Sequence, residues 1–265
     1  MERKVGVLVI SHGSRSDLWV RLVDEAVAAA EVPAGVPVVS SFLEIVEGRL
    51  IQDGIDALER QGVTDLVVVP LFVSAGSTHV DEIRGAFGVG QGQVQEHGLG
   101  PFRVEARVHF GEPLDEEPEL AARILLDQLA AVSSDPAKER VLLVGHGSAE
   151  DGFYRKWREG LDRVAERLQA IGGFAQVAGT MLLPNEAPGV MEQLLERGKA
   201  SADEVVLVAP FFLSEGYFTE KVIPGRLAGY TYRYSGRAML PHPLVSRWVE
   251  RQVVGRISGF GERVN

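Results

Sequence analysis

Three side chains in the first half of the sequence carry chemistry that could handle a metal ion and protons. His12, Glu44 and His79 each follow an apolar run, within VLVISHGSRSD, SSFLEI and PLFVSAGSTHVDEI respectively. Two imidazoles and a carboxylate suit a divalent first-row metal ion, and histidine also accepts protons near neutral pH. We therefore expect His12, Glu44 and His79 to be catalytic residues that also bind the metal.

Each of these residues also has a plain structural interpretation. The imidazole of His12, beside Gly13 and Ser14, could bind a backbone carbonyl or cap the following helix. Glu44 could be a solvated carboxylate near a helix start, and His79 could be the N-terminal residue of a helix without a chemical task. The functional interpretation is favoured because all three residues map to one predicted edge of a sheet.

That edge follows from the alternation of strand and helix patterns around these residues. Apolar residues with 3.6-residue spacing predict helices within 22–30 and 50–58, and residues 114–132 supply another helix. Runs rich in Val, Ile, Leu and Phe predict strands at 4–11, 36–43, 65–74 and 102–108. Continuous apolar strands between amphipathic helices predict a parallel sheet with helices on both faces. Functional residues of such sheets lie at the carboxyl ends of the strands.

The same pattern then starts again in the second half. VLLVGHGSAED at 141–151 repeats VLVISHGSRSD at 7–17, and LVAPFFLSEG repeats VVVPLFVSAG in the same order. Further strands are predicted at 140–145, 174–182, 204–213 and 236–240, with helices at 152–171, 187–198, 218–228 and 243–257. We predict an α/β protein of two tandem domains, 1–134 and 135–265, related by internal duplication and joined near Pro136.

The second copy serves as an internal comparison for the first. Matching prolines of the two copies are 140 positions apart (70 to 210), and this offset places Thr219 opposite His79. The position opposite Glu44 falls near Leu182, and only the histidine of the HGS tripeptide persists, as His146. We therefore expect the metal site to belong to the first half, and the second half to be a degenerate repeat.

The composition limits the class of partner and the compartment. A net charge of −10 and the lack of a basic stripe argue against nucleic acid. The chain has no cysteine, so disulfides and thiolate metal sites within it are excluded. No apolar run approaches the roughly eighteen residues of a membrane span, and no secretory signal is recognisable, so we expect a cytoplasmic protein without a membrane partner. The Gly-rich segment 88–100 is typical of a surface loop, which could act as a lid.

Together, the first-half motifs resemble those of the sirohydrochlorin chelatases, the cobalt- or iron-inserting class II chelatases related to ferrochelatase. The HGSR start, the SFLE strand end and the PLFVSAGSTHVDEI segment carry the resemblance, which covers essentially the whole chain in its long, two-domain form. It implies two flavodoxin-like, chelatase-like domains with a tetrapyrrole cleft that the second repeat completes. It also implies insertion of Co²⁺ or Fe²⁺ into sirohydrochlorin without ATP, in the biosynthesis of cobalamin or sirohaem.

The resemblance also assigns roles to residues. The two metal-handling histidines of the family correspond to His12 and His79, and its site carboxylate corresponds to Glu44. No histidine-rich tail or cysteine cluster selects cobalt over iron or nickel, so Co²⁺, Fe²⁺ and Ni²⁺ all stay open as the metal substrate. No organic cofactor is implied, and the fusion of the two halves predicts a monomer.

A substrate with eight carboxylates needs positive or hydrogen-bonding partners. The expected substrate-binding residues come from two polar loops and are Gly13, Ser14, Arg15, Ser74, Gly76, Ser77 and Thr78. Arg15 could instead pair with Asp17 at the surface. Two other functions stay open, a metal or tetrapyrrole carrier without catalysis and a histidine phosphatase. In the phosphatases an arginine normally precedes the histidine, whereas Ser11 precedes His12 in this chain.

Overall fold

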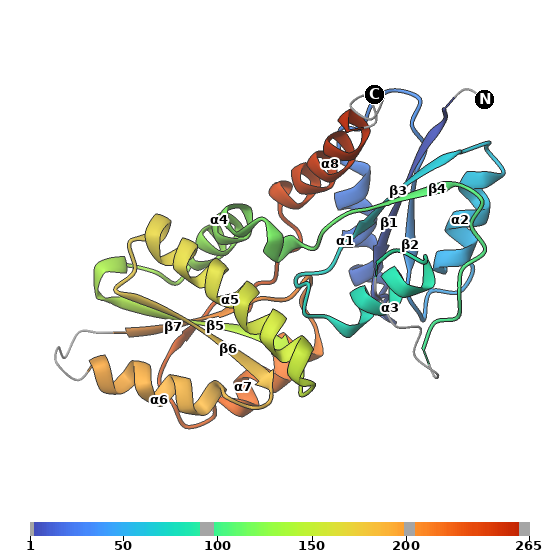
Figure 1. Ribbon diagram of the computed structural model, residues 1–265. Coiled ribbons are helices and arrows are strands. Elements are labelled where there is room, and N and C mark those ends of the chain that lie inside the picture. Colours follow the sequence, from blue (N-terminus) through green and yellow to red (C-terminus); the bar gives the residue numbers. More distant parts are fainter. Residues whose placement is uncertain (1–2, 91–97, 199–204, 260–265) are drawn as a thin grey trace. The chain divides into compact units, whose positions relative to one another are not determined.

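The architecture comes from a computed structural model that describes residues 3–90, 98–198 and 205–259. The middle of the expected lid loop, residues 91–97, lies outside the described residues, so the lid stays a prediction. The described chain divides into two compact units, each built on one four-stranded sheet (Figure 1).

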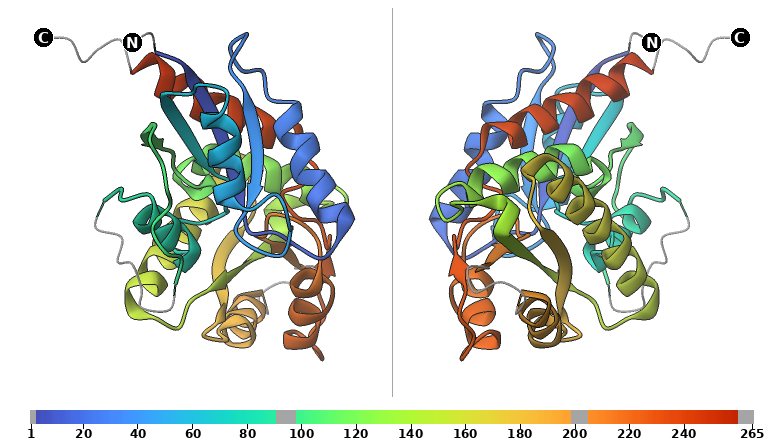
Figure 2. Two further views of the ribbon diagram at one scale, coloured as in Figure 1. Left: turned by 90° about the vertical axis from the view of Figure 1, so that its right-hand side faces the viewer. Right: turned by 90° about the vertical axis from the view of Figure 1, so that its left-hand side faces the viewer.

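The first unit is a parallel sheet between two layers of helices. Its strands are β1 (Val5–Ser11), β2 (Val38–Phe42), β3 (Asp65–Pro70) and β4 (Arg107–Phe110), in the order β2-β1-β3-β4. Its helices are α1 (Asp17–Ala28), α2 (Ile51–Glu59), α3 (Thr78–Ala86) and α8 (Pro243–Ser258). Helices α1 and α8 lie on one face of the sheet, and α2 and α3 lie on the other (Figures 1 and 2).

The second unit repeats this arrangement with its own parallel sheet. Its strands are β5 (Glu139–Gly147), β6 (Gln176–Leu183), β7 (Val205–Pro210) and β8 (Arg233–Tyr234), in the order β6-β5-β7-β8. Its helices are α4 (Pro118–Leu129), α5 (Asp151–Gly172), α6 (Ala187–Gly198) and α7 (Ile223–Arg226), with a π-helical turn, η3, at Phe218–Val222. Short 3₁₀ turns lie at Leu114–Glu116 (η1) and Pro136–Lys138 (η2). Among the described residues, no helix combines the length and the apolar character needed to cross a membrane.

The sheets confirm the predicted fold class, two tandem parallel α/β domains. The strand patterns explain why: residues 7–10 of β1 are fully buried, because successive side chains point to opposite faces and helices cover both. Leu8 and Ile10 pack into one cluster with Ile55 of α2 and Ile83 of α3. This core holds the carboxyl ends of β1, β2 and β3 side by side.

The two compact units do not follow the predicted domains 1–134 and 135–265, because each unit contains a helix from the other half of the sequence. Helix α4 follows β4 in sequence but belongs to the second unit, where it packs against α5 and β7. Helix α8 ends the described chain but belongs to the first unit, where it packs against α1 and β3. Each sheet is therefore covered on one face by a helix from the other half of the sequence.

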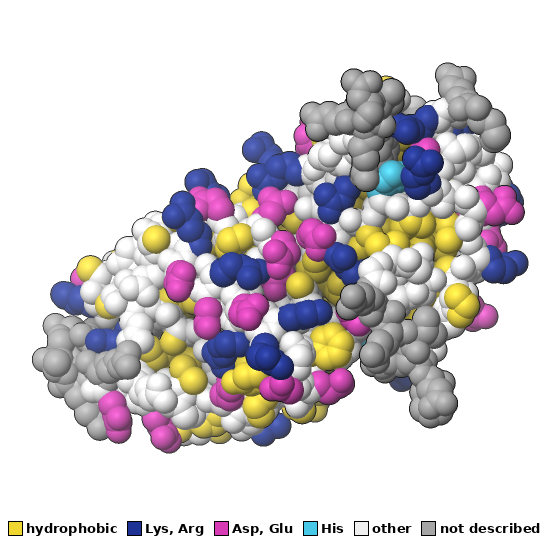
Figure 3. All heavy atoms as spheres, viewed as in Figure 1, with side chains coloured by type: hydrophobic (Ala, Val, Ile, Leu, Met, Phe, Trp, Pro, Cys, Tyr) yellow, Lys and Arg dark blue, Asp and Glu magenta, His cyan; other side chains and the backbone are white. Residues whose placement is uncertain are grey.

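Ion pairs join the exchanged helix α4 to its new neighbour α5. Arg163 of α5 binds Glu116, which precedes α4, at 2.8 Å, and Arg167 binds Glu119 of α4. The guanidinium of Arg167 is the main reason why the pKa of Glu119 lies below its ordinary value. In the view of Figure 3, basic and acidic side chains alternate over α4 and α5. Exposed pairs of this kind contribute little individually, so the burial of the apolar face of α4 must dominate.

Two strands of the structure do not lie where the sequence predicts them, because the backbone in the predicted segments binds other partners. Within the predicted strand 102–108, the N–H groups of residues 103, 105 and 106 donate to side chains of α2, so β4 begins only at Arg107. Within the predicted strand 236–240, residues 239 and 240 donate to carbonyls beyond the end of β7, and β8 is instead Arg233–Tyr234. In both segments, side chains or loop carbonyls accept hydrogen bonds from N–H groups that a longer strand would use within the sheet.

Because α8 packs within the first unit, we expect its central tryptophan to contribute strongly to the stability of that unit. Trp248 is fully buried, whereas Val254 on the same helix is 42% exposed. We expect Trp248→Ala to lower the free energy of unfolding by about 3–5 kcal/mol, because it leaves a large cavity. The control Val254→Ala should change it by no more than about 0.5 kcal/mol. Urea denaturation followed by circular dichroism measures both, and equal effects of the two variants would contradict the packing of α8.

Candidate functional site

The three candidate residues come from the carboxyl ends of three adjacent strands in the first unit. His12 directly follows β1, and Glu44 lies in the loop after β2. His79 is the second residue of α3, after the loop that follows β3. Because β1 lies between β2 and β3 in the sheet, His12 is expected to be the central residue of the three.

Distances bear this out. Nε2 of His12 lies 3.7 Å from Oε1 of Glu44. The rings of His12 and His79 have centroids 4.8 Å apart and meet edge to face at 74°. The sequence-based expectation that these residues converge is therefore correct for both pairs.

The ring of His12 is oriented by its own backbone. Its Nδ1 lies 3.2 Å from the carbonyl oxygen of Gly13. A carbonyl can only accept a hydrogen bond, so Nδ1 is the donor, and Nε2 carries the lone pair of the neutral ring. That lone pair and the carboxylate of Glu44 are then adjacent acceptors, an arrangement that a cation between them would stabilise.

The ring of His79 is oriented by a carboxylate that sequence reasoning missed. Its Nδ1 lies 3.3 Å from Oε2 of Glu82, one helical turn further along α3. A carboxylate that accepts from one imidazole nitrogen leaves the other nitrogen free for a metal ion and strengthens it as a ligand. The spacing of three residues within a helix was the available signal, but it required α3 to be recognised first.

The site is open. The side chains of His12, Glu44 and His79 are 40%, 55% and 38% exposed. Among the described residues, no group of three or more His, Asp or Glu side chains is already arranged to hold a metal ion. The predicted metal site is thus two close pairs of donors that share His12, rather than a formed cage.

The backbone brings His12 and Glu44 together. The N–H of Glu44 donates to the carbonyl of His12 at 3.1 Å. Gly13 has a φ of +101°, and a β-carbon at this position would lie 2.2 Å from the carbonyl oxygen of Glu44. Only glycine allows both the positive φ and the close approach, so the HGS tripeptide requires its glycine for local geometry.

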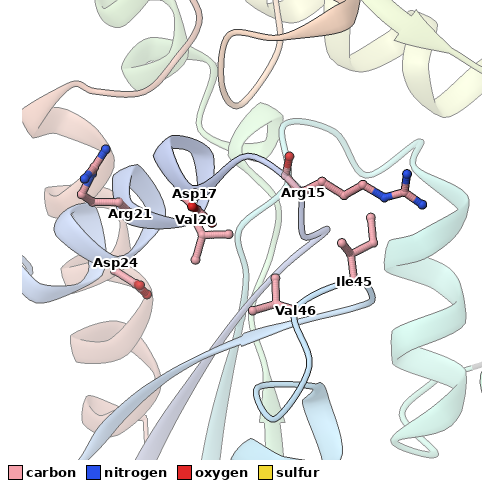
Figure 4. Close-up of a pocket in the computed structure, with 8 residues that line it drawn as sticks. Arg15, Asp17, Val20, Arg21, Asp24, Ile45 and Val46 are labelled. Atoms are coloured by element: carbon pink, nitrogen blue, oxygen red, sulfur yellow. The ribbon is translucent and has the colours of Figure 1, made fainter.

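A pocket lies beside this pair, between the start of α1 and the loop after β2. Its volume is about 550 Å³, and its lining includes Arg15, Arg21, Ile45 and Val46 (Figure 4). Figure 4 shows Arg15 and Ile45 on one side, with Arg21 and Asp24 of α1 on the other. Arg15 is exposed and forms no ion pair with any residue in the described ranges, so the alternative of a pair with Asp17 is not observed. Its guanidinium is available to an anion.

Ser14 shapes the start of α1. Its hydroxyl accepts from the N–H of Ser16, and the hydroxyl of Ser16 accepts from the N–H of Trp19 as the helix cap. Helix α1 therefore begins at Asp17, two residues after Arg15. The backbone between the strand and the helix is ordered by these bonds, which fixes the direction in which Arg15 leaves the chain.

The second predicted substrate loop is divided between the units. Thr78 opens α3 in the first unit, whereas Ser74, Gly76 and Ser77 belong to the second. Ser74 is buried, and its hydroxyl accepts from the N–H of Gly76. A β-carbon on Gly76 would lie 2.6 Å from the backbone nitrogen of Trp157. Ser74 and Gly76 therefore hold the loop in place, while Ser77 and Thr78 are partly exposed.

Asp115 anchors this loop from within the second unit. Its carboxylate accepts from the N–H of Ala75 at 2.9 Å, and it is fully buried. Burial raises the pKa of Asp115 to about 6, because a charged carboxylate loses its hydration there; the hydrogen bonds from Ser74 and Ala75 oppose this only in part. No pattern in the sequence marked this residue, since its neighbours are equally acidic.

The second repeat keeps the scaffold of the site with different side chains. Nδ1 of His146 lies 2.9 Å from the carbonyl of Gly147, and a β-carbon on Gly147 would lie 2.2 Å from the carbonyl oxygen of Leu183. The ring centroids of Phe218 and His146 lie 4.8 Å apart, and the angle between the ring planes is 78°. This is nearly the geometry of His12 and His79 in the first unit.

These contacts correct the expected correspondences by one residue. Phe218, not Thr219, takes the place of His79, because the connection after Pro210 is one residue shorter than the one after Pro70. Leu183, not Leu182, takes the place of Glu44, as the pairing of β6 with β5 requires. The second repeat therefore presents one imidazole among apolar side chains.

Comparisons with known proteins agree with this architecture. The CbiX family model matches residues 6–131 and again 140–254. The chain is 27% identical over 221 residues to the sirohydrochlorin ferrochelatase of Priestia megaterium, over 82% of this chain and 76% of that protein. The fold is similar to SirB from Bacillus subtilis with Fe³⁺ (TM-score 0.72, 21% identity, 98% of both chains). It is also similar to the sirohydrochlorin chelatase SirB from Bacillus subtilis subspecies spizizenii in complex with cobalt (TM-score 0.64, 21% identity, 98% and 96% of the chains).

The hydrogen bond between Glu82 and His79 can be tested through metal binding. We expect Glu82→Gln to weaken Co²⁺ binding by about tenfold, because the amide no longer supports the basicity of the imidazole. Glu47→Gln, an exposed residue of the loop after β2, makes the same change in net charge and serves as control. Isothermal titration calorimetry measures both variants. Equal affinities for Co²⁺ would mean that Glu82 does not act through His79.

The raised pKa of Asp115 predicts a defined pH dependence. In the unfolded chain this carboxyl loses its proton near pH 3.8, but in the folded protein it does so near pH 6. The folded state therefore binds more protons between these values, and the contribution of Asp115 to stability falls as pH rises from about 4 to about 6. The loss amounts to about 3 kcal/mol and levels off at higher pH.

The variant Asp115→Asn isolates this effect, because the amide oxygen can still accept from Ala75 but cannot titrate. The free energy of unfolding of wild type minus that of Asp115→Asn should fall by about 3 kcal/mol as pH rises through this window, because only the wild type loses stability from this position. Urea denaturation at several pH values gives the difference. A constant difference would show that Asp115 keeps its ordinary pKa.

Proposed function

The chain belongs to the CbiX family, and from this premise we propose that it inserts a divalent metal ion into a sirohydrochlorin-type tetrapyrrole without ATP. The observation that carries the proposal is the group of His12, Glu44 and His79 at one sheet edge. The second repeat has the same backbone there, with Phe218 and Leu183 in place of two donors. The first unit is thus the one equipped for metal chemistry.

An open set of donors suits a metal that must leave again. Neutral imidazole and carboxylate bind Co²⁺, Fe²⁺ and Ni²⁺, yet a macrocycle with four nitrogen donors competes successfully for the same ion. A closed cage or a thiolate site would hold a soft metal too firmly for transfer. Partial exposure of His12, Glu44 and His79 leaves room for the water that the incoming ion must shed.

Insertion also releases protons. The ring gives up two pyrrole N–H protons for each M²⁺ that it takes, so the site must accept them. Nε2 of His12 and the carboxylate of Glu44 are adjacent acceptors, and Nε2 of His79 is a third. Either imidazole can pass its proton to water after the metal has left. Residues that first bind the ion thus become the bases for the exchange.

The carboxylates of the substrate need local partners, because the chain carries a net charge of −10. Arg15 is the best-placed cation, since it lines the pocket beside the metal donors and lacks an ion-pair partner among the described residues. The backbone of Gly13 and Ser14 and the hydroxyls of Ser77 and Thr78 are further proposed contacts. Ser74 and Gly76, which hold their own loop, are proposed to support that loop rather than donate to the substrate.

The donor set supports Co²⁺ and Fe²⁺ equally, so the pathway, cobalamin or sirohaem, depends on which ion the protein receives. A carrier without catalysis would use the same residues. The two functions differ in turnover: an enzyme completes many insertions per molecule, whereas a carrier stops at one equivalent.

Insertion of Co²⁺ into sirohydrochlorin, followed by absorbance with catalytic amounts of protein, tests the proposal. We expect His12→Ala and His79→Ala each to lower the rate by at least about 100-fold, because each removes both a metal donor and a base. His146→Ala should leave the rate largely intact, since its neighbours are apolar. A stoichiometric absorbance change would identify a carrier, and hydrolysis of a generic phosphoester would identify a phosphatase. Equal losses in His146→Ala would assign the chemistry to the other repeat.

A further inference from the structure

The pocket beside Glu44 has a positive side chain on each of two sides. Arg15 and Arg21 both line it, and both side chains are exposed. In the view of Figure 4, they lie on opposite sides of Val20 and Val46. Neither guanidinium forms an ion pair within the described residues. Two unpaired arginines at one pocket are unexpected in a chain with a net charge of −10, and they indicate an anionic ligand.

Arg21 is unpaired because its acidic neighbour on the helix is already bound. Arg21 and Asp24 lie three residues apart on α1, a spacing at which opposite charges can pair. However, the guanidinium of Arg49 binds both carboxylate oxygens of Asp24, at 2.9 and 2.6 Å. A bidentate pair of this kind is strong and leaves the carboxylate little charge for a second cation. Arg49 thus neutralises Asp24, and Arg21 keeps its charge for another partner.

Asp17, the other acidic residue that lines the pocket, has a role in the helix. It is the first residue of α1, where the partial positive charge of the helix N-terminus favours a carboxylate. It forms no ion pair with Arg15 or with Arg21, all three being described residues. The acidic side chains around the pocket therefore do not occupy its two arginines.

The surface between the two arginines is apolar. Val20 of α1 lines it, together with Ile45 and Val46 of the loop after β2. The side chain of Ile45 is 49% exposed, so a ligand can reach it. The pocket volume of about 550 Å³ lies within the range of small-molecule sites. The pocket therefore suits a ligand with an apolar body and anionic groups at two points of its edge, rather than a single inorganic anion.

A sirohydrochlorin-type ring has these features. Its conjugated ring is flat and apolar, and its eight carboxylates surround the edge. A planar guanidinium binds a carboxylate through two parallel hydrogen bonds, which makes arginine the preferred partner for this group. The pocket also adjoins the expected metal donors, since Arg15 follows His12 by three residues and Ile45 directly follows Glu44.

We propose that this pocket binds one edge of the tetrapyrrole, with Arg15 and Arg21 each bound to a different carboxylate and the ring against Val20 and Ile45. Arg21 is then a specificity-determining residue, because it makes binding depend on a second carboxylate held apart from the first. This inference rests on the proposed function, which supplies the substrate. It gives a role to a residue of α1 that takes no part in metal binding.

Binding of metal-free sirohydrochlorin tests the pocket without turnover. Fluorescence titration of the ring with protein gives the dissociation constant, Kd. We expect Arg21→Gln and Arg15→Gln each to raise the Kd by about tenfold, because each variant loses one charge-assisted pair. The double variant should raise it by about 100-fold, since two separate contacts add in free energy.

Arg60→Gln is the matched control. Arg60 ends α2 on the other face of the sheet and is exposed, so its loss makes the same change in net charge outside the pocket. This variant should change the Kd by less than about twofold. Raising the salt concentration from about 0.1 M to about 1 M should reduce the effect of Arg21→Gln, because salt screens exposed charges.

Two results would overturn the role of Arg21. One is an unchanged Kd in Arg21→Gln, and the other is an equal loss in Arg60→Gln, which would reflect net charge alone. Competition with succinate tests the apolar part of the pocket. Succinate has two carboxylates but no ring, so its displacement of sirohydrochlorin at millimolar concentration would assign the pocket to small anions instead.

Titration with Co²⁺ separates this inference from the proposed function. Arg21→Gln should bind Co²⁺ at least as tightly as wild type, because it keeps the metal donors and loses a positive charge near them. If wild type and Arg21→Gln bind sirohydrochlorin equally well, the role of Arg21 fails and the proposed metal insertion stands. If wild type binds Co²⁺ but not sirohydrochlorin, the proposed function fails, and this inference fails with it.

Discussion

The site depends on a contact between the backbones of two strand ends. The N–H of Glu44 donates to the carbonyl of His12, and Gly13 lies so close to the carbonyl of Glu44 that no β-carbon fits between them. This contact places an imidazole and a carboxylate side by side before either side chain makes a bond of its own. The guanidinium of Arg49 ties the same loop to Asp24 of α1. Ile45 and Val46 of the same loop also line the pocket beside His12 and Glu44.

The duplicated chain separates what the scaffold requires from what the chemistry requires. In the second unit, Gly147 makes the same close approach to the carbonyl of Leu183, and His146 has the same bond to its neighbouring carbonyl. These features belong to the fold of the repeat. The carboxylate and the second imidazole are absent there, with Leu183 and Phe218 in their places, so the scaffold alone does not demand them. Their presence in the first unit is therefore the informative difference.

The sequence allowed the sheet, the duplication and the convergence of His12, Glu44 and His79 to be predicted, because apolar strands and their carboxyl ends follow simple periodic rules. Finer features depended on three-dimensional context. Glu82 became recognisable only with helix α3, whose apolar positions are few. The correspondence of Phe218 with His79 was displaced by a single residue of loop length, which an offset measured at the prolines does not register. The loop that contains Ser74 is anchored by Asp115, which accepts from the N–H of Ala75 forty residues earlier in the chain, and no local pattern connects the two.

The exchange of helices also sets an order of events during synthesis. Helix α8, which covers one face of the first sheet, lies after every strand of the second sheet in the chain. While the ribosome is still making the second unit, the first sheet has all four strands and the edge that carries His12, Glu44 and His79, but only α1 covers the face that α8 later completes. Full closure of that face waits for Trp248 to emerge. Until then, the nascent first unit exposes apolar surface that the complete chain buries under α8.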